Sequence, residues 1–89
     1  NQRCLTQLYQ YWQQRVRVSV DKLMIAAADK DGTNGYGLHV HLLDGEQSAW
    51  EREAENACGI VKVDATEQPK RLACWVSRLQ ERYELISRK

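Results

Sequence analysis

Two histidines placed two residues apart, His39 and His41, are the side chains of this chain best suited to metal chemistry. They lie in a stretch from Tyr36 to Leu42 whose alternating apolar residues predict a β-strand, so both imidazoles would project from one face. Paired imidazoles at this spacing can chelate a transition metal, with Asp44 or the cysteines as further ligands. Because there is no Cys-x-x-Cys motif and no second histidine pair, ordinary strand histidines are the favoured interpretation. No metal or cofactor is expected.

The three cysteines, Cys4, Cys58 and Cys74, are the next candidates. An odd number argues against the fully paired framework of a small secreted protein. All three lie near apolar stripes, where cysteine often serves as a small buried hydrophobe, so buried free thiols are the favoured interpretation. A disulfide between Cys58 and Cys74 is the alternative, because one ends a predicted helix and the other lies one turn into the next.

No pattern in the sequence places a nucleophile beside a base. The serines do not lie in a nucleophile-elbow motif, and no base can be assigned to a cysteine. The loop with Gly32, Gly35 and Gly37 leads into a predicted strand, whereas a phosphate-binding loop precedes a helix. The sequence therefore predicts a protein that is not an enzyme.

The elements that would hold these residues alternate in type. Apolar spacing predicts helices over residues 3–15, 47–58 and from about 68 to 86, the last with a core face of Leu72, Val76, Leu79, Tyr83 and Ile86. Period-two alternation predicts strands over 16–20 and 36–42. The apolar run at 60–63 predicts a third strand. Residues 23–28 fit a helix or a strand, with helix preferred, and 29–37 read as a loop.

This order predicts one α/β (or α+β) domain over residues 1–89. We expect a small sandwich without a complete third layer, in which a sheet of three to four strands contains a βαβ unit and is packed by three amphipathic helices. Each predicted helix carries one tryptophan (Trp12, Trp50 and Trp75), so all three helices are expected to pack on a common sheet.

Charge and composition bear on partners and location. The net charge is +1, with an acidic middle at residues 29–57 between two basic ends. This near-neutral balance makes a nucleic-acid partner unlikely, although the arginines of the outer helices could line one surface. No apolar run is long enough to span a membrane, and a cytoplasmic location is favoured over a secreted one.

The leading hypothesis is a non-catalytic protein-interaction or regulatory module whose partner is a protein or a second copy of the chain. The candidate contact residues are Tyr9, Gln10, Tyr11, Glu51 and Glu55. Tyrosine and glutamine give amphipathic, adaptable contacts of the kind found at interfaces. The alternatives are a small secreted effector or toxin-like protein with one disulfide, and a nucleic-acid-binding domain.

Overall fold

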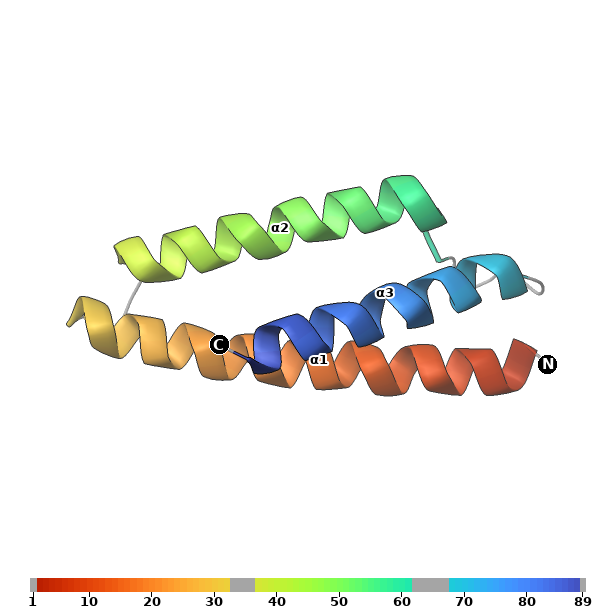
Figure 1. The fold of residues 1–89 in the computed structure, drawn as a ribbon, viewed down its shortest axis with the longest axis horizontal. Coiled ribbons are helices and arrows are strands. Elements are labelled where there is room, and N and C mark those ends of the chain that lie inside the picture. The colour runs from red at the N-terminus through yellow and green to blue at the C-terminus, as the bar shows by residue number, and fades with distance from the viewer. Residues whose placement is uncertain (1, 33–36, 62–67, 89) are drawn as a thin grey trace.

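The protein is a bundle of three long helices that run up, down and up (Figure 1). The computed structural model describes residues 2–32, 37–61 and 68–88. Helix α1 spans Gln2–Asp31, α2 spans Leu38–Cys58 and α3 spans Pro69–Ser87. The bundle measures 46 × 22 × 20 Å, because α1 is longer than its neighbours and α3 ends partway along it.

The predicted α/β fold is wrong, since the described residues contain helices and no strand. The alternation at residues 16–20 belongs to the middle of α1. Val16 is 3% exposed and Ala27 is buried on the same helix, whereas Val18 is 41% exposed. Val16, Val20 and Ala27 are separated by four and seven residues, which is helical periodicity. Burial of this face therefore overrides the strand preference of three β-branched residues.

The other two predicted strands are also wrong. Residues 38–42 form the first turns of α2, where Val40 is buried and Leu38 and Leu42 are exposed. Ile60 and Val61 have irregular backbone. Tyr36 and residues 62 and 63 lie outside the described residues. The described residues therefore contain no βαβ unit, and the three tryptophans, at positions 12, 50 and 75, lie on helices.

Several helix predictions are confirmed, with different boundaries. The predicted helices at 3–15 and 23–28 are both parts of α1, and the one at 47–58 begins nine residues earlier than expected. Helix α3 follows Gln68, with Pro69 in its first turn. Four of its five predicted core residues are buried, and Tyr83 is half-buried.

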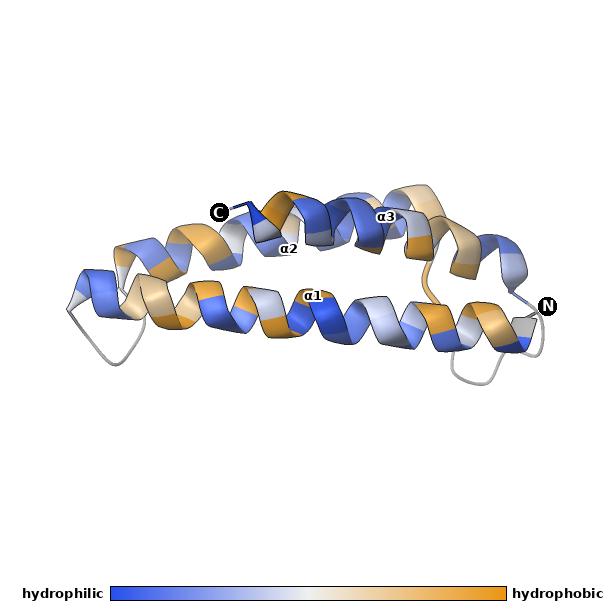
Figure 2. Cartoon of the chain, turned by 60° about the horizontal axis from the view of Figure 1, so that its bottom comes forward, coloured by the Kyte–Doolittle hydropathy of each residue, from blue (hydrophilic) through white to orange (hydrophobic). Residues whose placement is uncertain are grey.

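The core lies where all three helices meet. Its buried members are Val16, Ala54, Cys58, Trp75, Leu79 and Ile86. Each helix also carries polar residues along its length, as the hydropathy colouring shows (Figure 2).

No described helix combines the length and the apolar character that a bilayer crossing requires.

Asp31 links the end of α1 to the start of α2. Its carboxylate, 8% exposed, accepts hydrogen bonds from the backbone N–H of His39 at 3.0 and 3.1 Å and of Val40 at 3.4 Å. These N–H groups belong to the first turn of α2. The N–H groups of a first turn have no hydrogen-bond partner within their own helix. The Asp31 carboxylate also lies 2.5 Å from His39 Nδ1. The Asp31 side chain, at the end of α1, therefore stabilises the N-terminus of α2, whose N-cap residue is Gly37. The predicted loop at 29–37 is wrong for residues 29–31, which belong to α1.

We predict that Asp31→Ala lowers the melting temperature near neutral pH and has less effect in acid. The hydrogen bond to the His39 side chain holds the pKa of Asp31 below its usual value of 3.8. A lowered carboxyl pKa gives stability that is present above the usual value and is lost as the pH falls through the folded-state value. Melting curves from about pH 7 to about pH 2 should show the two proteins converging. Asp29→Ala is the matched control, and a constant difference across this range would contradict the prediction.

Candidate functional site

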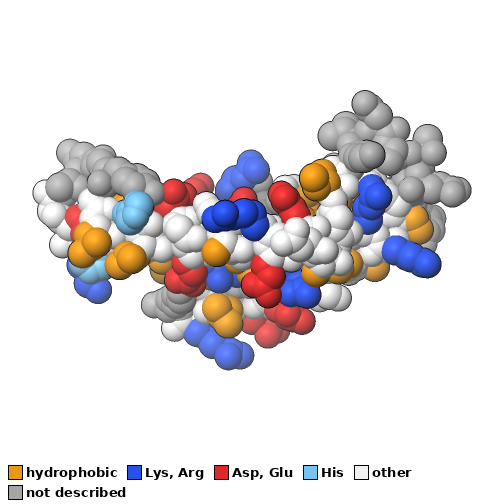
Figure 3. Space-filling model, turned by 90° about the horizontal axis from the view of Figure 1, so that it is seen from above, with side chains coloured by type: hydrophobic (Ala, Val, Ile, Leu, Met, Phe, Trp, Pro, Cys, Tyr) orange, Lys and Arg blue, Asp and Glu red, His pale blue; other side chains and the backbone are white. Residues whose placement is uncertain are grey.

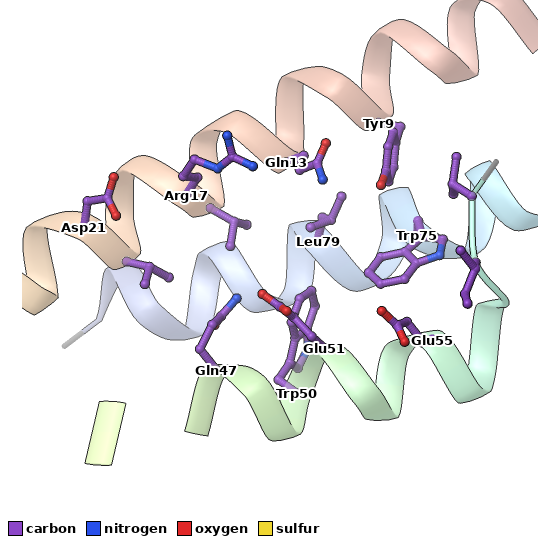
Figure 4. Close-up of a pocket in the computed structure, with 14 residues that line it drawn as sticks. Tyr9, Gln13, Arg17, Asp21, Gln47, Trp50, Glu51, Glu55, Trp75 and Leu79 are labelled. Carbon is purple, nitrogen blue, oxygen red and sulfur yellow. The ribbon is translucent and has the colours of Figure 1, made fainter. Parts of the chain in front are cut away.

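A groove of about 380 Å³ lies between α1 and α2, with α3 along its base (Figure 4). Its apolar lining comes from all three helices and consists chiefly of Tyr9, Val16, Val20, Trp50, Trp75 and Leu79. The α1 residues that line it run from Tyr9 to Asp21, which corresponds to roughly 18 Å of helix. The groove is thus a trough about three helical turns long.

Trp75 is fixed at one end of this groove. Its indole Nε1 donates a 2.7 Å hydrogen bond to the carbonyl oxygen of Gly59. Its ring meets the rings of Tyr9 and Trp50 edge-on, at centroid distances of 6.2 and 6.1 Å. Gly59 itself ends α2 with φ 86°, and its N–H donates to the Glu55 carbonyl at 2.7 Å. This turn brings the chain across the end of the groove.

A disulfide joins Cys58 and Cys74 directly beside this turn. The favoured expectation of buried free thiols is therefore wrong for these two residues, and the alternative pairing is the one that the structure contains. Cys4 carries a free thiol, but it is exposed rather than buried. Since Cys74 precedes Trp75, the bridge ties the aromatic lining to the end of α2.

The opposite end of the groove is held by a buried arginine. Arg82 is 7% exposed, and its Nε donates to Gln47 Oε1 at 2.9 Å. Its Nη1 lies 3.4 Å from Glu46 Oε1, and its guanidinium faces the Trp50 ring at 5.7 Å from the centroid. Arg82 therefore fixes two lining residues of α2, Gln47 and Trp50, from the α3 side.

Polar residues form the two walls of the groove at four-residue spacing. The α1 wall carries Gln13, Arg17 and Asp21, and the α2 wall carries Gln47, Glu51 and Glu55. All are exposed except Gln47, which is half-buried. Residues four apart lie on one helix face, so each wall presents its three side chains in a row (Figure 4). The charges are three carboxylates against one guanidinium.

The residues expected to bind a partner do not form one surface. Tyr9, Glu51 and Glu55 line the groove, and partial burial raises the pKa of Tyr9. Gln10 and Tyr11 lie outside its lining. Positions 9 and 11 differ by about 200° around a helix, so the two tyrosines face different ways.

Tyr11 belongs to a second aromatic cluster, on the side where α1 meets α3. Its ring meets Trp12 edge-on at 5.2 Å, and Trp12 in turn meets Tyr83 at 5.6 Å. Arg15 faces the Tyr83 ring at 4.9 Å and donates a 2.6 Å hydrogen bond to the Tyr83 hydroxyl. This hydrogen bond lowers the pKa of Tyr83. These contacts join α1 to α3.

The two histidines do not share a face, because the predicted strand is a helix. His39 and His41 differ by about 200° around α2, and His39 contacts Asp31. Among residues 2–32, 37–61 and 68–88 there is no group of three side chains placed to hold a metal ion.

Three of the arginines considered for a nucleic-acid surface contact other parts of the bundle. Arg82 is buried, Arg15 is engaged with Tyr83, and Arg71 donates to the Ile60 carbonyl at 3.3 Å. On the face drawn in Figure 3, acidic and basic side chains are interspersed.

Comparison of the chain with family models, with curated proteins and with solved structures found no significant match. Trp50, Trp75 and the apolar lining were missed as site residues by the sequence reasoning, which assigned the tryptophans to the core of a sheet. The sequence signal that could have indicated the α2 wall of the groove was the four-residue spacing of the polar residues at 47, 51 and 55.

Proposed function

We propose that this protein is a non-catalytic binding module that holds a helical segment of a partner protein in the groove between α1 and α2. The observation that carries this proposal is an aromatic and aliphatic trough left open between two polar walls. Apolar grooves rimmed by polar side chains are typical of surfaces that bind another polypeptide.

A helix suits this groove better than an extended strand does. Both walls are helices whose own backbone groups are paired internally, so they offer no hydrogen bonds to the backbone of a strand. A bound helix pairs its own backbone and needs only side-chain contacts. Its residues four apart repeat about every 6 Å, which matches the rows on both walls.

The lining also supports a binding role over a catalytic one. None of the described residues that line the groove is serine, threonine, cysteine, histidine or lysine. Its carboxylates belong to the exposed Asp21, Glu51 and Glu55, and the described lining holds no histidine or thiol beside them to take part in proton transfer.

The disulfide favours a second candidate function, a small secreted effector that uses the same groove. Disulfides persist in oxidising compartments and are rare in the cytosol. The Cys58–Cys74 bridge therefore weighs against the cytoplasmic location preferred from the sequence. The two candidates differ in where the protein acts, not in how it binds.

The test is calorimetry of the disulfide-bonded protein with three synthetic helical peptides of about sixteen residues, long enough to form helix. All three carry leucine on one face, and their other face is lysine, glutamine or glutamate. At least one should bind, and Gln13→Trp should weaken it by about tenfold or more, because a large ring on this exposed wall fills the trough.

Gln14→Trp is the matched control, since Gln14 is also exposed on α1 but does not line the groove. It should leave the affinity unchanged. Absence of binding by all three peptides, or equal effects of the two substitutions, would overturn the proposal.

A further inference from the structure

We infer, building on the proposed function, that the groove selects a basic amphipathic helix whose lysine or arginine side chains meet Glu51 and Glu55. The inference concerns the chemistry of the partner and goes beyond the presence of a binding groove. Three observations carry it: the position of the two carboxylates, the aromatic rings beside them, and the charge on the opposite wall.

Glu51 and Glu55 lie one helical turn apart on the same wall. Figure 4 shows both side chains leaving α2 beside the rings of Trp50 and Trp75. In the part of the chain that the structure describes, no hydrogen bond or ion pair engages either carboxylate. Both carboxylates are therefore accessible to a ligand in the groove, and a helix with cations at four-residue spacing would complement both.

The aromatic lining favours a lysine or arginine side chain over a small cation that has no apolar stem. Tyr9 and Trp50 are half-buried and line the groove, so part of each ring is accessible. Long basic side chains lay their methylene stems on apolar surface while the charged head reaches a carboxylate. A cation near an aromatic ring gains further attraction from the ring face.

The opposite wall determines which edge of the bound helix is basic. Arg17 projects from α1 among the lining residues, with Asp21 one turn beyond it. Near Arg17 a second cation would be repelled, whereas near Glu51 and Glu55 it would be attracted. The bound helix is therefore oriented with its basic edge along α2 and its apolar face towards Val20 and Trp50, which are half-buried in the lining.

The experiment compares the lysine, glutamine and glutamate peptides on the disulfide-bonded protein and on the variant Glu51→Gln with Glu55→Gln. The lysine peptide should bind the unmodified protein tightest, and the double variant should weaken it by about threefold to tenfold. Added salt should reduce this difference, because exposed charges are screened.

The control removes the same charge elsewhere, with Glu53→Gln and Glu81→Gln, which are exposed and do not line the groove. It should leave the affinity within twofold of the original, roughly 0.4 kcal/mol. If the glutamine or glutamate peptide binds as tightly as the lysine peptide, or both double variants act alike, the inference is wrong and the groove still binds helices. If no peptide binds, the proposed function itself fails.

Discussion

Replacing Cys58 and Cys74 together by alanine is expected to lower the free energy of unfolding by about 3 kcal/mol. The two residues are 16 apart in sequence, so the bridge closes a short loop and limits the freedom of the unfolded chain. In a domain of this size such a loss corresponds to a melting temperature lower by roughly 12–24 °C. Urea and thermal unfolding followed by circular dichroism would measure both quantities.

Reduction of the unmodified protein should reproduce this loss, because it opens the same bridge. Cys4→Ser is the matched control, since that thiol is exposed and unpaired. A double alanine variant as stable as the original would show that the end of α2 is held by packing and by the Trp75–Gly59 hydrogen bond alone.

Leu72→Asp is expected to unfold the domain. Leu72 is 1% exposed, the most buried large side chain on α3. The substitution removes its apolar contacts and leaves a carboxylate without a solvating partner, a combination that costs more than about 4 kcal/mol. Small domains have total stabilities of about 5–15 kcal/mol, so the helical signal in circular dichroism should fall sharply at 25 °C or on mild heating.

Leu85→Asp places the same change on the same helix at a side chain that is 51% exposed. It should remain folded, with a melting temperature close to that of the original. If the two variants were equally stable, the face of α3 assigned to the core would be wrong.

The fold was only partly predictable because local and tertiary preferences disagree along α1. Val16, Val18 and Val20 carry a strong local preference for strand, and nothing nearby shows that their helix continues to Asp31. The decision comes from contacts with residues far along the chain: Val16 packs in one cluster with Ala54, Trp75 and Leu79. By contrast α3 was predictable, because its apolar spacing, its proline and its burial all agree.

For the candidate site, the residue types in the sequence suggested candidate contact residues, but the sequence did not predict how those residues are arranged in space. Glu51, Glu55 and Tyr9 were predicted as contact residues from their type alone, and the structure places all three in the lining of the groove. That they contact a partner stays a prediction. Tyr11 was grouped with Tyr9 by proximity in sequence, but it packs in the other aromatic cluster. The groove itself depends on how α1 and α2 lie over α3, which a sequence does not show.

The most direct test of a binding groove between α1 and α2 is fluorine NMR of protein labelled with fluorotryptophan. The three signals can be assigned with single Trp→Phe variants. Trp50 and Trp75 line the groove and report on it, whereas Trp12 lies outside the lining and reports on the second aromatic cluster. On addition of the lysine peptide, the account predicts that the Trp50 and Trp75 signals shift together while that of Trp12 stays in place. A shift of Trp12 alone, or no shift at saturating peptide, would contradict it.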